Sequence, residues 1–508
     1  MNVPPQIIVI GAGIGGLTSA IQLAASGYSV RLFDRHQHVG GKIRTSMSDA
    51  GPVDAGPTVL TMRHIFDELL GFTNGHLEDH IHLIPQDILA RHFWTDGSTL
   101  DLYANIEASA RAIKEFSGSN SEQEFLRYCH HCRELFQGFY KPMMRAAEPR
   151  FSTLIFHVFK NPSLIRKIYP GFSLARSLSQ QFSDPRLAQL FGRYATYVGG
   201  SPFLSPAILS LIWHAEASGV WIVQGGMHKL AAALAKLATT LGVEIRLGNH
   251  VDRIVQKRGR VHEVVLRNTE QYTADAVIFN GDPRALAVGS LGKDFEIIAR
   301  HTIKKKRSYS ARVYSFAAKI SGNELAHHNV LFDDNPASEF NDLQVDRIPN
   351  NPTLYICAQD RGQGIIPPIL ERFEIIANAP AGVTINSDKE LEQWNKKIIR
   401  KLNSFDITFD PAPMISNITT PYQFHQLFPE SLGALYGQSP HGLLAAFTRP
   451  TARTKIPGLY LAGGGTHPGA GLPMAAISGM HAAEAITSDL TLTSMSAPMV
   501  TRGGISTG

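Results

Sequence analysis

The sequence predicts an α/β protein whose Rossmann-type nucleotide-binding domain is assembled from three separate chain segments. A strand, a glycine-rich turn, a helix and a second strand follow one another at the N-terminus. The same α/β character returns in the middle of the chain after a long helical stretch, and a final strand enters a glycine cluster near the C-terminus. Because other patterns separate these stretches, we expect a second, α+β domain that is inserted in two pieces.

The N-terminal unit begins with the continuous apolar run Ile7–Ile10, which leads directly into glycines. Leu17–Ala25 has the small and apolar residues of a closely packed helix, and Gly27 stops it. Val30–Phe33 is a second apolar run. Strand, helix and strand in this order form a βαβ unit.

The middle of the chain is first helical and then mixed. From about Glu107 to Ala217 the pattern is mostly helical, and Met227–Leu241 follows as an amphipathic helix. Four short apolar runs come next and are predicted as strands, and a turn at Lys257–Arg260 connects the second run to the third. The four strands are Val243–Leu247, Val251–Gln256, Val261–Arg267 and Ala274–Phe279.

The remainder of the chain is mixed in pattern. Candidate strands lie at Val313–Ala317 and Thr353–Ala358. Leu459–Ala462 is a last apolar strand, followed by glycines and a helix from Met474 to about Ile486. The final stretch, Thr491–Gly508, is rich in Ser, Thr and Gly and is expected to be disordered.

The composition excludes several classes of protein. The chain has 508 residues, 44% hydrophobic and 18% charged, so a large core can form and global disorder is excluded. A net charge of +5 over this length is too weak to indicate nucleic acid as a partner. Three cysteines are too few for a disulfide framework and fit a reducing compartment. No apolar stretch reaches the roughly 18 residues that span a bilayer, and the N-terminus lacks the basic region of a signal peptide.

The motif Gly11-x-Gly13-x-x-Gly16 carries the first chemical signal, because it follows a strand and opens a helix. Gly11 permits a tight turn, Gly13 lets the backbone approach a pyrophosphate, and Gly16 lets helix and strand pack closely. Asp34 ends the second strand, where a carboxylate accepts hydrogen bonds from a ribose hydroxyl and disfavours a 2′-phosphate. The motif therefore predicts a bound dinucleotide and leaves FAD and NAD open.

Two segments after the second strand distinguish these cofactors through a resemblance. Gly40-Gly41-Lys42 comes first, and Gly56-Pro57-Thr58 follows. This arrangement resembles the superfamily of flavin-dependent amine oxidases and phytoene desaturases. The resemblance implies that Gly41 and Lys42 run along the pyrophosphate of FAD and that Gly56, Pro57 and Thr58 lie near the flavin. The family usually has arginine where this chain has Lys42, and we expect the lysine to keep the phosphate contact as a point charge.

The segment from Pro457 to Met474 resembles the signature of carotenoid desaturases. Gly463 and Gly464 follow the last strand, and Pro473 and Met474 lie where the last helix begins. The resemblance implies that the strand leads the chain to the flavin and that the N-terminus of the helix points at it. The positive end of the helix dipole would stabilise the negative charge of a reduced flavin.

Other segments are similar to one subgroup, the bacterial 1-hydroxycarotenoid 3,4-desaturases, also called methoxyneurosporene dehydrogenases. The most discriminating of them runs from Gly56 to Leu69, and Phe191–Tyr197 and Ser308–Phe316 agree with it. In the family as a whole, the position of Val251 contacts adenine through its backbone, and Asn280-Gly-Asp-Pro matches a strand end.

The resemblance implies an FAD-dependent desaturase that introduces the C3–C4 double bond into a 1-hydroxylated acyclic carotenoid, with oxygen or a quinone as electron acceptor. A hydride leaves to the flavin, the remaining positive charge spreads over the polyene, and a proton is lost from the adjacent carbon, so that no strong nucleophile or metal is needed. No catalytic residue or metal ligand is assigned. Glu216 and Tyr197 are candidates for lining the substrate pocket or ordinary residues of a domain interface. The alternatives are another carotene desaturase, a flavin amine oxidase and a non-catalytic carrier of prenyl lipids.

Such an apolar substrate would be drawn from a bilayer, so we expect a peripheral protein on the cytoplasmic side of the membrane. Phe151–Leu178 mixes apolar side chains with Lys and Arg, which is typical of an interfacial amphipathic element or of a helical core. Lys304–Arg307 could meet anionic headgroups or form a solvated face. Cys129 and Cys132 are predicted as core-facing residues of one helix, because a second ligand pair is missing.

The expected division of the chain follows from these patterns. The FAD-binding domain comprises residues 1–72, 217–290 and 445–490, the substrate domain comprises residues 73–216, with the helical region, and 291–444, and residues 491–508 form a flexible tail.

Overall fold

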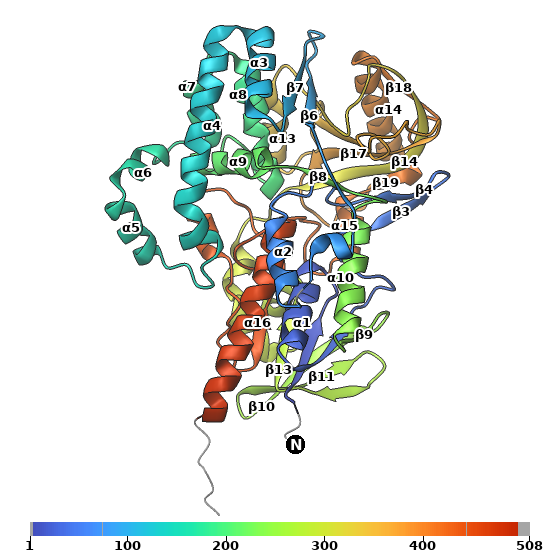
Figure 1. Ribbon diagram of the computed structural model, residues 1–508. Coiled ribbons are helices and arrows are strands. Elements are labelled where there is room, and N and C mark those ends of the chain that lie inside the picture. The colour runs from blue at the N-terminus through green and yellow to red at the C-terminus, as the bar shows by residue number, and fades with distance from the viewer. Residues whose placement is uncertain (1–3, 74, 443, 496–508) are drawn as a thin grey trace, which may run out of the picture.

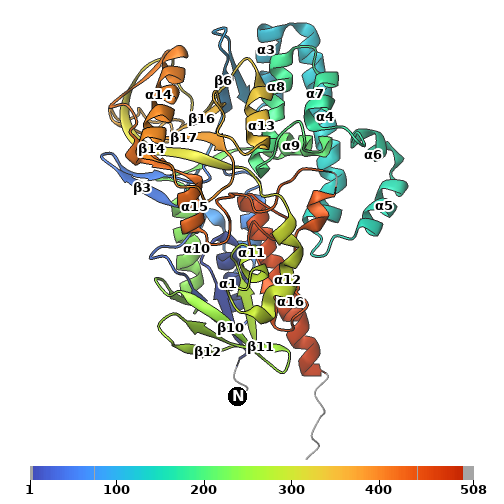
Figure 2. The same cartoon turned by 180° about the vertical axis from the view of Figure 1, so that it is seen from behind.

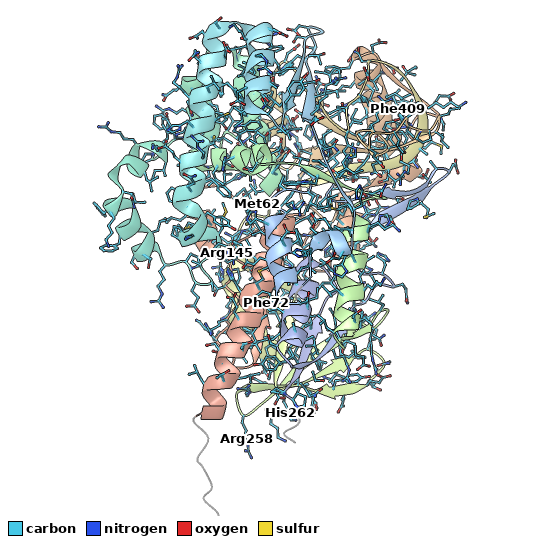
Figure 3. All side chains as sticks on the ribbon, viewed as in Figure 1. Met62, Phe72, Arg145, Arg258, His262 and Phe409 are labelled. Atoms are coloured by element: carbon cyan, nitrogen blue, oxygen red, sulfur yellow. The ribbon has the colours of Figure 1, made fainter. Side chains whose placement is uncertain are left out.

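The computed structural model describes residues 4–73, 75–442 and 444–495, which form two parts (Figure 1). The lower part in Figure 1 contains a parallel sheet, and the upper part contains a larger mixed sheet and a group of helices at its side. In Figure 3, Arg258 and His262 lie at the bottom of the lower part, and Phe409 lies on the right side of the upper part.

The lower part is built on a five-stranded, fully parallel sheet in the order β20-β13-β1-β2-β9. The predicted N-terminal βαβ unit is confirmed at its centre. The strands come from three separated stretches of the chain, and their bounds are β1 (Gln6–Ile10), β2 (Ser29–Phe33), β9 (Glu244–Arg246), β13 (Ala276–Phe279) and β20 (Leu459–Leu461).

Both faces of this sheet are buried. Ile7 and Val9 point to the face that is covered by α1 (Ile14–Ala25), α10 (His228–Thr240) and α16 (Leu472–Met495). Ile8 and Phe33 pack on the opposite face against an antiparallel meander. Burial on both faces explains why β1, β13 and β20 are apolar at almost every position. The meander consists of β10 (Val251–Lys257), β11 (Arg260–Leu266) and β12 (Gln271–Thr273).

The upper part contains an eight-stranded mixed sheet in the order β18-β14-β17-β16-β15-β6-β7, with β19 paired to β14. Along β17, the side chains of Phe373, Ile375 and Ala377 pack with α14 in a hydrophobic core. The alternating residues Glu374 and Ile376 face the other way, into a cavity. The elements are β6 (Ile88–Phe93), β7 (Thr99–Tyr103), β14 (Ser310–Gly322), β15 (His328–Leu331), β16 (Leu354–Ala358), β17 (Glu371–Ala379), β18 (Ile407–Asp410), β19 (Ile418–Thr419) and α14 (Asp388–Ser404).

The stretch between Glu107 and Ala217 is helical, as predicted. Most of its helices pack beside the end of the large sheet that carries β6 and β7, whereas α5 and α6 stand off to one side in both views (Figures 1 and 2). The helices are α3 (Ile106–Ser117), α4 (Ser119–Phe139), α5 (Phe151–Lys160), α6 (Pro162–Lys167), α7 (Leu174–Gln181), α8 (Pro185–Gly192) and α9 (Leu211–Ala217).

Shorter elements connect the two parts. Two antiparallel strand pairs, β3–β4 and β5–β8, lie between the sheets in sequence and in space. The remaining elements are α2 (His64–Gly71), β3 (Thr45–Ser48), β4 (Gly51–Asp54), β5 (Leu83–Pro85), β8 (Trp221–Val223), α11 (Arg284–Ala287), α12 (Glu296–Ala299), α13 (Pro336–Gln344) and α15 (Pro421–Leu427).

The structure corrects one prediction about the C-terminus. The last helix, α16, begins at Leu472, two residues before the predicted start, and it continues to Met495. The predicted disordered tail is therefore wrong for Thr491–Met495, which extend this helix although their composition is polar. The rest of that predicted tail, residues 496–508, lies outside the described residues.

Candidate functional site

One cavity of about 810 Å³ extends from the glycine-rich loops of the lower part to the large sheet of the upper part. Its lining joins residues that are hundreds of positions apart in the sequence. Twelve of the fourteen residues predicted from the sequence line this cavity: Gly11, Gly13, Asp34, Gly41, Lys42, Gly56, Pro57, Thr58, Val251, Gly463, Gly464 and Pro473. The two exceptions, Gly16 and Met474, have other positions.

The first glycine motif has the geometry that its spacing predicts. Gly11 has a φ of +105°, which favours glycine. Gly13 precedes α1 with an ordinary extended backbone and borders the cavity. A Cβ atom on Gly16 would lie 2.1 Å from the carbonyl oxygen of Gly11, so Gly16 permits the close contact of helix and strand and does not line the cavity.

Asn280, at the end of β13, holds this motif from the opposite side. Its Nδ2 donates a hydrogen bond of 3.0 Å to the carbonyl oxygen of Gly11. A Cβ atom on Gly15 would lie 2.7 Å from both Oδ1 of Asn280 and the backbone nitrogen of Gly463. Helices α1 and α16 and the end of β13 therefore meet where only glycine fits.

Asp34 is buried at the end of β2, and its carboxylate is held by two backbone donors. The nitrogen of Ala12 donates to Oδ2 at 2.7 Å, and the nitrogen of His36 donates to Oδ1 at 2.8 Å. A carboxylate with two N–H donors still has lone pairs for further donors. Its position at the cavity fits the predicted contact with a ribose hydroxyl.

A group of three cations surrounds one carboxylate beside the glycine loops. Lys42 donates to the carbonyl oxygen of Leu435, and Arg307 is paired with Asp282. Arg449 donates to the carbonyl oxygen of Gly464 at 3.0 Å. Burial lowers the pKa of Lys42 to about 8 and that of Arg449 to about 10, although Asp282 acts in the opposite direction on both.

This group has an excess of positive charge in a buried place, which an anionic ligand would offset. Arg449 was not predicted, because it lies in a stretch without a motif and reaches Gly464 only through the fold. Arg307 corrects a prediction. It is the last residue of the basic run that begins at Lys304, yet its side chain is only 10% exposed and serves this group, so the run is not one solvated or headgroup-binding face.

The C-terminal glycine segment lies opposite the first motif. Gly463 has a φ of +97°, and the cavity is lined by Gly464 and by Pro473 in the first turn of α16. The N-terminus of α16 therefore borders the cavity, as the sequence predicts. The side chain of Met474 packs against the hydrophobic core of the lower part and does not line the cavity, because the helix begins before this residue.

The residues present fit a dinucleotide of the FAD type. Glycines occur at positions where a Cβ atom would come close to a neighbouring loop; at Gly41, for example, a Cβ atom would lie 3.2 Å from the Cα of Gly13. Lys42 and the N-termini of α1 and α16 supply positive potential for phosphates and for a reduced flavin. The residues that would hold the cofactor are thus the glycine motifs, Asp34 and Lys42.

The far end of the cavity is mostly apolar. Of the two residues named as candidates for lining the substrate pocket, Tyr197 lines the cavity, whereas Glu216 is buried behind Tyr197 and does not line it. The hydroxyl of Tyr197 donates to Oε2 of Glu216 at 2.5 Å. Arg193 donates to Oε1 of Glu216 at 3.1 Å, and Tyr194 donates to the same oxygen at 2.7 Å. The charge of Glu216 is therefore compensated by Arg193 inside the core, and both of its oxygens already have partners, so it is not available as a base for the substrate.

Thr58 is the start of a polar chain that leads away from the cavity. Its hydroxyl is 2.7 Å from the hydroxyl of Tyr355, which is 2.7 Å from Nδ1 of His328. The ligand atoms of His327, His328 and Cys357 lie within 4.8 Å of one another, a grouping that the sequence analysis missed. His327 directly precedes β15, His328 begins it and Cys357 lies in β16, so no local spacing in the sequence indicates the group. Nδ1 of His327 bonds the carbonyl oxygen of Arg361 at 2.8 Å.

The pair Cys129 and Cys132 lies where the sequence predicts. Both thiols are free and buried in α4, and Nε1 of Trp213 donates to Sγ of Cys129 at 3.2 Å. Burial raises the pKa of Cys129 to about 12, so this thiol stays protonated and unreactive at neutral pH.

Comparisons with known proteins agree with this site. Residues 14–312 match the family described as flavin containing amine oxidoreductase. The chain is 48% identical to a hydroxyneurosporene desaturase of Cereibacter sphaeroides, with 96% of this chain and 99% of that protein covered. It is 46% identical, over the same shares, to a hydroxyneurosporene desaturase of Rhodobacter capsulatus. An oxidoreductase from Methanosarcina mazei has the same fold, with a TM-score of 0.62 at 16% identity over 94% of this chain and 100% of that chain.

Proposed function

The chain belongs to the family of flavin-containing amine oxidoreductases, and we propose that within this family it is a desaturase that forms the C3–C4 double bond of a 1-hydroxylated acyclic carotenoid. It is an FAD-dependent oxidoreductase. The observation that carries the substrate proposal is the 48% identity, over nearly the full length of both chains, to a hydroxyneurosporene desaturase. This similarity favours a carotenoid over an amine and favours an enzyme over a lipid carrier.

The shape and chemistry of the cavity support this proposal. Next to the dinucleotide loops, the cavity continues along the large sheet and under α7 and α8, where an extended apolar molecule fits. Dispersion and exclusion of water would hold such a molecule along the apolar side chains of this end. The apolar side chains that line this end are Ala175, Ala188, Phe203, Val313, Val330, Phe332, Phe340 and Ile376.

The protein contributes orientation and a dry environment to the reaction. FAD, when bound, supplies the acceptor for a hydride from the carbon next to the polyene. The apolar walls keep the chain extended and exclude water, and the buried charge of Glu216 is compensated by Arg193, so that no uncompensated negative charge faces the substrate at Tyr197. The N-terminus of α16 gives the favourable potential for negative charge at the cofactor end.

A membrane contact is the second part of the proposal. Among the described residues, no helix combines the length and apolar character that crossing a bilayer requires. Phe156 and Phe159 of α5 are 60% and 71% exposed, and Nζ of Lys160 lies 4.4 Å above the ring of Phe156. Exposed aromatic rings beside a cation suit the interface of a bilayer. These exposed side chains support our proposal that α5 lies against the cytoplasmic surface of a membrane. We also propose oxygen or a quinone as the final electron acceptor. The double variant Phe156→Ser/Phe159→Ser should sediment less with vesicles.

An anaerobic single turnover tests the function. FAD-loaded protein is mixed with liposomes that carry 1-hydroxyneurosporene, and the flavin and polyene absorbances are followed. We expect bleaching of the flavin together with a red-shifted, longer polyene. If the flavin stays oxidised with this substrate but bleaches with neurosporene or phytoene, the proposed substrate is wrong and another carotene is the substrate.

A further inference from the structure

Glu374 is a buried acid in the wall of the cavity for which the fold provides no partner. It lies in the middle of β17, opposite Ser315 of β14 and Cys357 of β16. Its side chain is fully buried and faces the cavity. Neither carboxyl oxygen has a hydrogen-bond partner among the residues that the structure describes. A buried, unsatisfied carboxyl is costly, so its presence calls for a ligand that completes its hydrogen bonds.

Neither of the two charged groups that interact with Glu374 electrostatically forms a hydrogen bond with it, and Nε of Arg44 also lacks a hydrogen-bond partner among the described residues. Nη2 of Arg44 donates to Oγ1 of Thr419 at 2.9 Å, and its guanidinium lies 5.3 Å from the centre of the Phe424 ring. Asp54 accepts from the backbone nitrogen of Met227 at 2.5 Å, at the start of α10. Burial, helped by the charge of Asp54, raises the pKa of Glu374 well above its usual range. A neutral carboxyl has one donor and one free acceptor oxygen.

A second buried acid of the same cavity shows the contrast. Oε1 of Glu339 accepts from Nδ2 of Asn378 at 2.8 Å, and its Oε2 accepts from the backbone nitrogen of Thr353 at 3.0 Å. Both of its oxygens are therefore used within the protein. The fold satisfies one buried acid of this wall and leaves Glu374, four residues from Asn378 on the same strand face, open toward the cavity.

Glu374 lies at the end of the cavity wall that is nearest to the dinucleotide loops. It interacts electrostatically with Arg44, which precedes β3, and with Asp54, which ends β4, and β4 packs on β17. Arg44 lies two residues after Lys42, and Asp54 lies two residues before Gly56, so both are close in sequence to the loops that would hold the cofactor. Asn378, on the same face of the strand, lies instead beside Glu339 of α13. The open carboxyl thus lies near the loops that would hold the cofactor.

We propose that the carboxyl group of Glu374 binds the tertiary hydroxyl group of the substrate and so selects 1-hydroxylated carotenoids. This inference rests on the proposed function. In that substrate the hydroxyl is on C1, and three single bonds of about 1.5 Å put its oxygen within about 4 Å of C3. The residue that recognises it must therefore line the reactive end of the cavity, as Glu374 does. An alcohol and a neutral carboxyl each donate and accept one hydrogen bond, so the two groups satisfy each other.

The test compares two substrates in three proteins. The substrates are 1-hydroxyneurosporene and its analogue that has a saturated 1,2 end without the hydroxyl, both in liposomes. The proteins are wild type, Glu374→Leu and Glu374→Gln, because glutamine keeps one donor and one acceptor and leucine keeps neither. The matched control is Glu339→Gln, which alters the other buried acid of the wall. FAD content and melting temperature establish that each variant is folded.

We expect wild type to prefer the hydroxylated substrate in kcat/KM. Glu374→Leu should lower kcat/KM for this substrate by about 10- to 100-fold, because the hydroxyl group would lose its hydration in the cavity without gaining a hydrogen-bond partner. The same variant should leave kcat/KM for the analogue unchanged. Glu374→Gln should keep the preference within about fivefold, and Glu339→Gln should not change the ratio. Binding measured by quenching of tryptophan fluorescence should show the same loss for Glu374→Leu.

Two results distinguish a failure of the inference about Glu374 from a failure of the proposed function. If Glu374→Leu binds and converts the hydroxylated substrate with the wild-type preference, the inference is wrong and the desaturase function stands. If wild type converts neither substrate, the proposed function is wrong, and unchanged binding of both carotenoids by Glu374→Leu would then also reject the role of Glu374 in recognising a hydroxyl group.

Discussion

Replacing the second and the third glycine of the first motif should have different effects. A Cβ atom on Gly13 would lie 3.1 Å from Nδ2 of Asn280, a contact that a small shift relieves, and its backbone at φ −75° and ψ 174° suits valine. Gly13→Val should therefore change the stability of the apoprotein by at most about 1 kcal/mol. Its side chain enters the cavity where the backbone approaches a pyrophosphate, so FAD affinity should fall at least about 100-fold, or about 2.7 kcal/mol.

Gly16→Ala should show the opposite pattern. Its Cβ would lie 2.1 Å from the carbonyl oxygen of Gly11 and 2.9 Å from Nδ2 of Asn280, so α1 must move away from β1. We expect a loss of about 3 kcal/mol or more in the free energy of unfolding, which lowers the melting temperature by about 3 °C or more. Thermal unfolding of the apoproteins and titration with FAD, followed by flavin fluorescence, measure both effects. Gly13→Val that keeps stoichiometric FAD, or that melts as early as Gly16→Ala, would refute this reasoning.

Two further predictions concern buried charges. The pKa of Lys42 is lowered to about 8 in the folded protein from an ordinary value near 10.5, and bound phosphate favours its protonated form. FAD affinity should therefore fall as the pH rises above about 8. The variant Lys42→Met should bind FAD more weakly at pH 7 and show no such fall. The stability of the apoprotein should instead rise with pH between about 8 and 10.5, because in this range Lys42 keeps its proton in the unfolded chain and has lost it in the folded protein. Glu216→Gln leaves the Arg193 guanidinium, 8% exposed, without its counter-charge, and should lower the urea midpoint by the equivalent of about 3 kcal/mol; a shift below about 0.5 kcal/mol would mean that the ion pair is dispensable.

The sequence predicts those parts of the fold whose geometry depends on residues that are close together in the chain. Ile7–Ile10 is apolar because both faces of its sheet are covered, and Gly11 and Gly16 occur where a backbone angle and a close contact exclude other residues. Such constraints act within a few residues, so the spacing alone reveals them. The same holds for Asp34 at the end of β2. The division of the chain into six segments stays a prediction, since the sheet order alone does not fix where each segment ends.

The part of the site that was missed depends on contacts between distant elements. Arg449 reaches Gly464 through a loop without a recognisable pattern, and His328 meets Cys357 only because β15 pairs with β16. Neither residue has a neighbour in sequence with which it forms a motif. Met474 was assigned to the cavity by its motif, but a helix that starts at Leu472 turns its side chain toward the core. A shift of two residues at a helix start is enough to change the direction of a side chain.

The same reasoning explains why β17 escaped prediction and why this strand is informative. Strand patterns are recognised by apolar residues on the buried face and polar residues on the solvated face, and β17 is buried on both faces while carrying Arg372, Glu374 and Asn378. Arg372 has a partner in Asp360 and Asn378 has one in Glu339, so their polarity is explained within the protein. Glu374 is the member of this series that the described residues leave unsatisfied. Where a sequence breaks a local rule and the fold offers no compensation, the compensation is expected from a ligand, and the hydroxyl group of the substrate is the group whose chemistry matches it.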